Sequence, residues 1–321
     1  AAMTGAGAAT TAAVGGMMIP HMEEEGYDPG FASAIQAMGG VFGPIIPPST
    51  LMVLYAVASG ESVGGMFLGG ILPGLYLGLV LIIVVVMLCK KKGYGGGAKF
   101  NGKAFVKATV DAFWALLAPI IILGGIYSGI MTPTESSAVC CFYCMIVGLF
   151  IYRELSVKDL VKVVAEGVKS SAGIMLIVAA TQVFGWVLTR AQIPQTIAKM
   201  FTENVSNGTV FLFAVCLILL VAGCFIDAVP ALLIFAPIFC PTAQAYGLNM
   251  VHFGVVMVVV LCIGLATPPV GINLYVASSV GGQPVHKIIP HLPIPLLTIA
   301  IATIVLVLSP PIVTLLPTLF G

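Results

Sequence analysis

Long apolar runs separated by short polar segments dominate the chain. They predict membrane spans at five ranges: residues 66–89, 113–131, 136–152, 170–189 and 291–318. A helix that crosses a bilayer needs about 20 predominantly apolar residues, and these runs have about that length. The pattern therefore predicts an all-α, multi-pass membrane protein.

Two further apolar segments are interrupted by glycine and proline. Residues 31–60 contain the string GPIIPPS at 43–49, and residues 251–278 contain GLATPPVG at 264–271. Broken helices are tolerated within a membrane only where they are buried or line a cavity. We therefore expect two broken transmembrane helices inside the protein.

A third pattern predicts re-entrant helical hairpins. Residues 209–223 and 228–240 are each too short to cross a bilayer, and they flank the polar residue Asp227. They predict a hairpin with its tip at Gly223–Asp227. Residues 1–20 resemble the returning arm of a second such hairpin, with its tip near Met3–Gly7. We expect its first arm to precede residue 1, so that the chain is an N-terminally incomplete part of a longer protein.

Two parts of the chain repeat each other. Five glycines and prolines recur 221 residues later in the same order: Pro20, Gly26, Gly43, Pro47 and Pro48 correspond to Pro241, Gly247, Gly264, Pro268 and Pro269. Residues 62–65 (SVGG) recur at 279–282, a shorter spacing that predicts a four-residue insertion or deletion between the copies. Internal repeats of this kind are common in secondary transporters.

The basic segments determine the expected orientation. Lysine- and arginine-rich loops prefer the cytoplasm, which places residues 90–107 and 153–169 there, the latter as an amphipathic interfacial helix. Three spans then separate the two copies, so the second copy runs opposite to the first. We expect an inverted repeat. Its transport-domain halves are residues 1–89 and 209–321, joined by connecting arms and scaffold helices at 90–208.

Composition narrows the class of function. Hydrophobic residues make up 60% of the chain and charged residues 8%, whereas soluble domains are about 25% charged. This excludes a soluble enzyme, a nucleic-acid-binding protein and a disordered chain. The eight cysteines lie in or beside apolar runs, where we expect small buried residues, and the four histidines lie near predicted span ends, where we expect interfacial positions.

Motifs of enzymes and nucleotide-driven pumps are not found in the sequence. It contains no P-loop, dinucleotide fingerprint, nucleophile elbow or HExxH motif. We therefore predict a transporter and not an enzyme, with no organic cofactor and with energy from an ion gradient; a separate ATPase subunit is the alternative source of energy.

The hairpin tips and helix breaks are the places where chemistry is expected. Half-helix N-termini attract anions, whereas unwound carbonyls and half-helix C-termini hold small cations. Each hairpin and its break therefore predict one cation site, with an anionic substrate between the copies. We expect the substrate to be bound by residues at these tips and breaks: Thr4, Gly5, Ala6, Ser49, Pro268 and Asn273.

Asp227 is the only charged residue between Glu203 and Lys287. A carboxylate at this depth is a functional candidate, but Asp is also a good helix N-cap. Both interpretations remain open, and they are compatible. A carboxylate would repel an anion, so we do not expect Asp227 to bind substrate directly.

Several strings resemble the large membrane subunit (M, DctM-type) of TRAP transporters, the tripartite ATP-independent periplasmic family. They are MTGAGAATTAAVGGMMIP, GPIIPPSTLMVLY, GGIYSGIMTPTESSAV, CFIDAVPALLIFAPIFCP and HFGVVMVVVLCIGLATPPVGINLYV. They span almost the whole chain in family order. The resemblance implies an elevator-type importer in the bacterial inner membrane, which couples sodium to uptake of an organic acid anion such as a dicarboxylate, sialic acid or sulfonate.

The resemblance also implies partners and ligands. A periplasmic binding protein would deliver the substrate, and a small four-helix membrane subunit, fused or separate, would brace the scaffold. Two or more sodium ions would be co-transported. The implied first sodium site comprises Thr4, Gly7, Gly43, Ile46 and Pro47, largely through backbone carbonyls. The second comprises Gly223, Gly264, Thr267 and Val270.

The chain departs from the family pattern at two places. The first tip of many members reads Ser-Gly-Ser followed by an Asp, where this chain has Thr4-Gly5-Ala6 and Thr10; an Asn that often precedes the second break is Val260 here. Three alternatives stand beside the TRAP interpretation. They are a binding-protein-independent sodium–dicarboxylate symporter, an ion channel and an intramembrane protease, although Asp227 has no partner Asp for the last.

Overall fold

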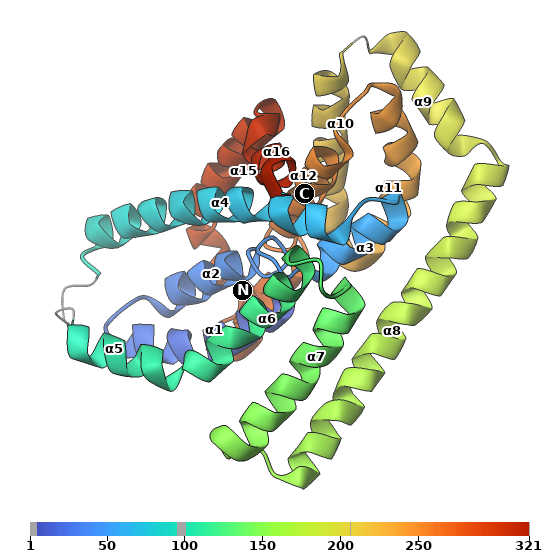
Figure 1. Ribbon diagram of the computed structural model, residues 1–321. Helices are drawn as coiled ribbons and strands as arrows, with labels where there is room; N and C mark the ends of the chain where they lie inside the picture. Colours follow the sequence, from blue (N-terminus) through green and yellow to red (C-terminus); the bar gives the residue numbers. More distant parts are fainter. Residues whose placement is uncertain (1–4, 95–100, 206, 321) are drawn as a thin grey trace. The chain divides into compact units, whose positions relative to one another are not determined.

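The computed structural model describes residues 5–94, 101–205 and 207–320. Most of these residues lie in helices (Figure 1). Those residues form sixteen α-helices and no β-strand. Five helices are long and apolar enough to cross a membrane, or seven if each of two bent helix pairs counts as one span. The chain is therefore an all-α, polytopic membrane protein, as the apolar pattern predicts.

The chain divides into two compact units. Unit 1 combines Ala1–Gly95 with Thr181–Gly321, and unit 2 is Gly96–Ala180. Unit 1 thus brings the two copies of the repeat into one body. The finer division at residues 89 and 208 stays a prediction.

The helices of unit 1 follow the same order in both copies. The first copy contains α1 (Gly7–Glu24), α2 (Pro29–Gly40), α3 (Thr50–Ser59) and α4 (Val63–Lys92). The second contains α10 (Gly208–Phe225), α11 (Ala228–Ala245), α12 (Met250–Gly264), α13 (Ile272–Gly281), α14 (Val285–Ile288), a short 3-10 turn (Ile289–His291), α15 (Pro293–Leu308) and α16 (Pro310–Phe320). Helices α10 and α11 pack together as a hairpin, as the sequence predicts.

Matching helix boundaries confirm the repeat. Helices α1 and α11 both have 18 residues and begin 221 positions apart. Before each broken helix the chain makes the same turn: Gly26 and Gly247 have positive φ angles of 82° and 68°. Asp28 and Asn249 then cap α2 and α12 through their side chains. Glycine at such a position avoids the steric cost of a Cβ, which explains why these positions repeat.

The four-residue insertion is wrong. Ser62 is the N-cap of α4, whereas Ser279 lies near the end of α13, so the SVGG strings are not equivalent in structure. Instead α3 and α13 begin 222 positions apart, as do α4 and α14. Small residues are favoured both at helix starts and at helix ends, so a short Ser/Gly string carries little register information.

The two copies of the repeat pack crosswise. Helix α1 packs against α2 and α13, and α11 packs against α12 and α3. Each hairpin arm therefore contacts the first half of its own broken helix and the second half of the other copy's helix. Both breaks contain a cis Pro–Pro bond, at Pro47–Pro48 and Pro268–Pro269.

Unit 2 contains three helices that overlap predicted spans (α6, α7 and α8) and one, α5, that was not predicted. They are α5 (Gly102–Asp111), α6 (Phe113–Tyr127), α7 (Pro133–Ile146) with a π-helical turn (Val147–Ile151), and the first part of α8 (Val157–Arg190). A capping box between Thr132 and Glu135 starts α7: the Glu135 amide donates to the Thr132 hydroxyl (3.3 Å), and the Thr132 amide donates to the Glu135 carboxylate (2.8 Å).

Three boundaries differ from the expectation. The separate interfacial helix at 153–169 is wrong, because α8 begins within it at Val157 and continues to Arg190 without a break. Much of that segment carries residues with high helix propensity, and it contains no proline. Residues 102–107, expected in a basic loop, belong to α5, which continues to Asp111. The last apolar segment is two helices, separated at Ser309 where Pro310 and Pro311 follow.

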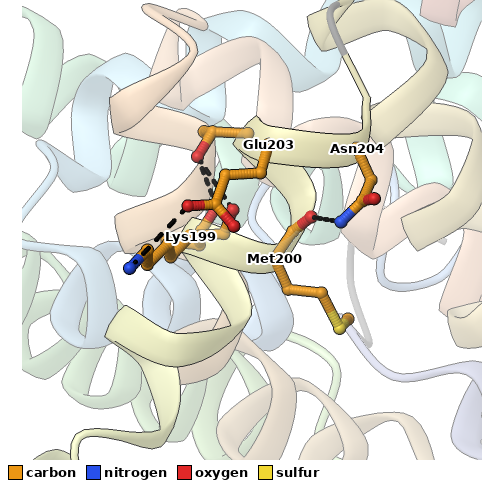
Figure 2. Close-up of polar contacts among 6 residues, drawn as sticks. Lys199, Met200, Glu203 and Asn204 are labelled. Atoms are coloured by element: carbon orange, nitrogen blue, oxygen red, sulfur yellow. Dashed lines mark hydrogen bonds and ion pairs between the residues drawn. The ribbon is translucent and has the colours of Figure 1, made fainter.

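Helix α9 (Ile193–Asn204) is amphipathic, and one face packs against α11. Phe201 contacts Phe211 edge to face at 5.2 Å between ring centroids. Figure 2 shows the polar contacts: the Lys199 ammonium lies 3.7 Å from the Glu203 carboxylate, and the Asn204 amide donates to the Met200 carbonyl at 2.7 Å. Both charged side chains are mostly exposed, so this pair contributes little to stability.

A polar cluster joins the two copies at one end of unit 1. The imidazole of His291 lies 3.0 Å from the Asp28 carboxylate and 3.2 Å from the Lys92 ammonium. That ammonium also lies 4.9 Å from the centre of the Phe31 ring. In contrast to the expected interfacial position, His252 is buried, and its Nε2 lies 2.9 Å from the Leu306 carbonyl.

Candidate functional site

The tip of hairpin 1 lies against the first helix break. A Cβ built on Gly43 would lie 2.6 Å from the carbonyl oxygen of Ala6, so only glycine permits this approach. Gly5 has a φ of +60°, and a Cβ there would lie 3.1 Å from the Pro48 carbonyl oxygen. The structure thus places Gly43, a member of the predicted first cation site, against the residue before α1. Thr4 lies outside the described residues.

The remaining members of the predicted first set have no side-chain oxygen to offer a cation. The side chain of Ile46 faces α4, where a Cβ on Gly74 would lie 2.8 Å from Ile46 Cγ1. Pro47 is buried. Gly7 begins α1 and lies beside Asn273, whose Oδ1 would be 3.1 Å from a Cβ on Gly7. Any role of these residues in holding a cation rests on their carbonyl oxygens.

Ser49 holds the first break in shape. Its hydroxyl donates to the Pro44 carbonyl and accepts from the Met52 amide at 3.2 Å, and its side chain is buried. Ser49 is therefore the N-cap of α3. In the described conformation both bonds lie within the protein, and contact with substrate stays a prediction.

Replacing Ser49 by alanine is expected to destabilise the protein by about 1 kcal/mol, the usual effect of losing a Ser or Thr cap. The loss of the Pro44 contact adds to this. Thermal unfolding of the purified protein in detergent measures the change. Ser49→Thr keeps the hydroxyl and serves as the control; equal destabilisation by both variants would contradict the capping role.

The tip of hairpin 2 lies against the second break even more closely. A Cβ on Gly264 would lie 2.6 Å from the Cα of Gly223, so the two backbones are in direct contact. The amides of Val270 and Gly271 both donate to the Cys224 carbonyl at 3.2 Å. The Thr267 hydroxyl donates to the Ile263 carbonyl at 2.7 Å.

All four residues of the predicted second cation site therefore lie at one place. Helix α10 ends at Phe225 and α12 ends at Gly264, so two helix C-termini present carbonyl groups there. Such carbonyls at half-helix ends suit a small cation. Whether these residues bind sodium stays a prediction.

Asp227 occupies the N-cap position of α11, but its side chain makes no capping hydrogen bond. Its side chain is exposed at the tip of hairpin 2. Capping therefore does not account for this carboxylate in the described conformation. Its functional role stays a prediction.

The predicted substrate residues have different environments. Ala6 is exposed and Pro268 is half-buried. Asn273 is fully buried on α13, where its Nδ2 donates to the Ala37 carbonyl at 3.4 Å and its backbone amide donates to the Leu265 carbonyl at 2.9 Å. The amide side chain of Asn273 therefore links the second copy to α2 of the first.

Three residues at these contacts escaped the sequence analysis: Thr11, Gly40 and Cys224. Thr11 and Gly40 bring α1 against the end of α2, and Cys224 supplies the carbonyl that anchors the second break. The signal for Gly40 was its position just before a break. Cys224 acts through its backbone, so its side chain carried no signal. Among the described residues no group of three or more His, Cys, Asp or Glu side chains is placed to hold a metal ion.

The comparison with known families agrees with this architecture. A family model described as "Tripartite ATP-independent periplasmic transporter, DctM component" matches residues 1–313. The chain belongs to the DctM family. The resemblance noted from the sequence strings is thereby confirmed, and DctM proteins are transporter components rather than enzymes.

Three relatives of the chain carry different substrates in their names. The chain is 41% identical over 315 residues to the C4-dicarboxylate TRAP transporter large permease protein DctM of Pseudomonas aeruginosa, covering 98% of this chain and 74% of that protein. It is 37% identical over 319 residues to the sialic acid TRAP transporter large permease protein SiaM of Vibrio cholerae, covering 99% and 74%.

The third is the isethionate TRAP transporter permease protein DctMQ of Oleidesulfovibrio alaskensis, 40% identical over 307 residues. The match covers 95% of this chain and 48% of that protein, so the chain spans about half the length of this DctM relative.

Proposed function

We propose that the chain is the large permease part of a sodium-coupled importer of a small organic acid anion. The DctM family and the transport functions in the names of its relatives support a secondary transporter. Those names concern C4-dicarboxylates, sialic acid and isethionate, which are all anions. A carboxylate or sulfonate is therefore the proposed substrate class.

One observation carries the proposal: each hairpin tip contacts a helix break in its own copy of the repeat. At the first break the Cα of Gly43 faces the Ala6 carbonyl, and at the second Gly264 touches Gly223. Helices α2 and α12 end at these breaks, and α3 and α13 begin there. Carbonyl ends favour a cation and N-terminal ends favour an anion, so cation and substrate sites would lie side by side.

Adjacent sodium and substrate sites would couple the binding of the two ligands. Sodium at a tip would order the backbone that binds the anion, and the anion would raise sodium affinity by the same factor. The crosswise packing of the two copies supports movement of unit 1 as one body, which is what an elevator mechanism requires. The basic segments at 90–107 and 153–169 support a cytoplasmic placement of these parts of the chain and a bacterial inner-membrane location.

Two partners belong to the proposal. A periplasmic binding protein would deliver the anion, consistent with the tripartite periplasmic family description. A small membrane subunit would complete the permease, consistent with the longer DctMQ relative, of which the chain covers 48%. In this chain's own system the small subunit is either fused or separate.

Uptake into proteoliposomes tests the proposal. The full-length protein with its small subunit would be supplied with labelled C4-dicarboxylates, isethionate or sialic acid. We expect accumulation of one class only when an inward sodium gradient and the binding protein are both present, because the gradient supplies the energy and the binding protein loads the site.

The controls separate the alternatives. Uptake driven by sodium without the binding protein would indicate a stand-alone symporter. Rapid flux that dissipates a gradient without accumulation would indicate a channel. Accumulation that is indifferent to sodium would contradict the interpretation of the two breaks as sodium sites.

A further inference from the structure

Helix α5 joins α6 through a sharp bend that a side chain holds in place. The two helices make an angle of 59°, and only Ala112 separates them (Figure 1). The Tyr152 hydroxyl donates to the Asp111 carbonyl at 2.7 Å and accepts from the Ala115 amide at 3.3 Å. In an unbroken helix this carbonyl and this amide bond to each other. A side chain inserted between them kinks a helix, so the bend is built into unit 2.

Helix α5 has an apolar face that is open to its surroundings. Phe105, Val106 and Val110 lie on this face and are between 60% and 65% exposed. Lys103 and Lys107 lie one turn apart beside it. No residue of α5 is buried, and its packing partner in unit 2 is α6. The described part of unit 2 therefore leaves the apolar face of α5 uncovered.

The bend places the start of α5 at the edge of the membrane. Helix α6 has 15 residues and is about 22 Å long, whereas a hydrocarbon core is about 30 Å thick. With α6 along the membrane normal, the 10 residues of α5, at 59° to it, add about 8 Å of depth. The two helices together then cover the core, and Lys103, near the start of α5, lies at the level of the lipid headgroups.

The charges of α5 are complementary to anionic lipids. Lysine side chains reach from an apolar surface to the headgroups, and amphipathic helices with such lysines bind anionic membranes. Asp111 is the one acidic residue of α5, and no ion pair joins it to Lys103 or Lys107 among the described residues. Residues 90–107 are predicted on the cytoplasmic side, where the membrane surface is negative. Both ammonium groups can therefore contact lipid phosphates.

We propose that α5 is a binding site for the headgroups of anionic phospholipids, held at the membrane surface by Tyr152. Lys103 and Lys107 contact the phosphate groups, and Val106 and Val110 contact the upper parts of the acyl chains. The site is distinct from the two helix breaks and does not depend on the proposed sodium coupling. It fixes the start of α6, and with it the packed pair of α6 and α7, in relation to the membrane surface.

Photocrosslinking in lipid nanodiscs tests what covers α5. The full-length protein with its small subunit carries the photoreactive amino acid p-benzoylphenylalanine in place of Val106. The bilayer contains equal amounts of phosphatidylglycerol and phosphatidylcholine with identical acyl chains, and mass spectrometry identifies the adducts. We expect lipid adducts in which phosphatidylglycerol exceeds phosphatidylcholine at least about fivefold, the attraction that one basic residue near an anionic surface provides.

Removing the two charges tests the role of the lysines. Lys103→Gln combined with Lys107→Gln is expected to abolish the preference, as is about 1 M KCl, which limits charge interactions to ~3 Å. Lys199→Gln combined with Arg190→Gln is the matched control, because it removes the same charge from a different part of the chain. This control is expected to keep the preference. Equal yields of the two lipid adducts in the protein with both lysines, or an equal loss of preference in the control, would overturn the inference.

Tyr152→Phe tests the bend. Without the hydroxyl, the Asp111 carbonyl and the Ala115 amide can bond directly, so α5 is expected to turn toward the direction of α6 and to lose its lipid adducts. Tyr143→Phe is the control, because the Tyr143 hydroxyl bonds the Trp114 carbonyl at 2.7 Å outside the bend. Unchanged lipid adducts in Tyr152→Phe would overturn the role of the bend.

The identity of the crosslinked partner decides between a lipid site and a protein interface. Adducts with the small subunit, or with another segment of this chain, in place of lipid would overturn the inference. None of these measurements involves sodium or substrate, so failure of the lipid site and failure of the proposed transport function are separate results.

Discussion

Gly264→Ala is expected to reduce sodium-dependent uptake at least about 100-fold, because displacing a binding constellation by about 1 Å has effects of that size. The new Cβ would lie 2.6 Å from both the Cα and the carbonyl carbon of Gly223. These are backbone atoms, so no side-chain rotation relieves the contact. The tip of hairpin 2 must move away from the second break, and the amides of Val270 and Gly271 then lose their hydrogen bonds to the Cys224 carbonyl.

Uptake into proteoliposomes with the binding protein and a sodium gradient measures the effect. Gly16→Ala is the control, because a Cβ there meets only Val280 Cγ1, at 3.9 Å, in the same unit. Gly43→Ala, in the equivalent position of the first copy, is expected to lose uptake as Gly264→Ala does. Normal uptake by Gly264→Ala would show that contact between tip and break is dispensable.

Gly254→Ala is expected to destabilise the folded protein by about 3 kcal/mol, the upper end of the usual cost of overpacking a core. The Tyr55 ring lies directly on the Cα of Gly254, and an added Cβ would overlap it. Tyr55 is 0% exposed, and its hydroxyl donates to the Met250 carbonyl at 2.9 Å. The ring therefore has no space into which it can withdraw.

A double mutant separates overlap from other effects of the substitution. Adding Tyr55→Leu to Gly254→Ala removes part of the ring volume and is expected to recover a measurable part of the lost stability, although Tyr55→Leu alone is destabilising. Tyr55→Phe removes only the hydroxyl, which donates to the Met250 carbonyl and accepts from the Cys240 thiol at 3.8 Å, and it should cost about 1 kcal/mol. Equilibrium unfolding in detergent measures all four proteins. Additive effects of the two substitutions would contradict the overlap.

Local signals in the sequence predicted much of the fold. Apolar runs located α4, α7, α10 and α11, and the glycine–proline strings located both breaks to within a few residues. The turn at Gly26 and its copy at Gly247 were visible because positive φ angles select glycine wherever they recur. Helix boundaries were less predictable where the sequence has no proline to end a helix. In α8 an amphipathic segment and an apolar span form one continuous helix, and no local signal marks the point where one gives way to the other.

Some features of the candidate sites could also be predicted from the sequence, and others could not. The sequence located Gly43, Gly223 and Gly264 because close backbone approach demands glycine. It did not reveal that Ser49 is bound within the break or that the carboxylate of Asp227 leaves its capping position unused. Those outcomes depend on which atoms neighbouring segments bring within hydrogen-bonding distance.

By itself the sequence determined the membrane class, the two interrupted helices and the repeat that relates them, because these follow from apolar length, backbone permissiveness and the order of residues along the chain. The tertiary structure alone decided that α1 packs against α13 and α11 against α3, and so brought Asn273 to the tip of the opposite copy's hairpin. Contacts between residues more than 200 positions apart depend on how whole helices pack. No local pattern of hydrophobicity or propensity encodes that choice.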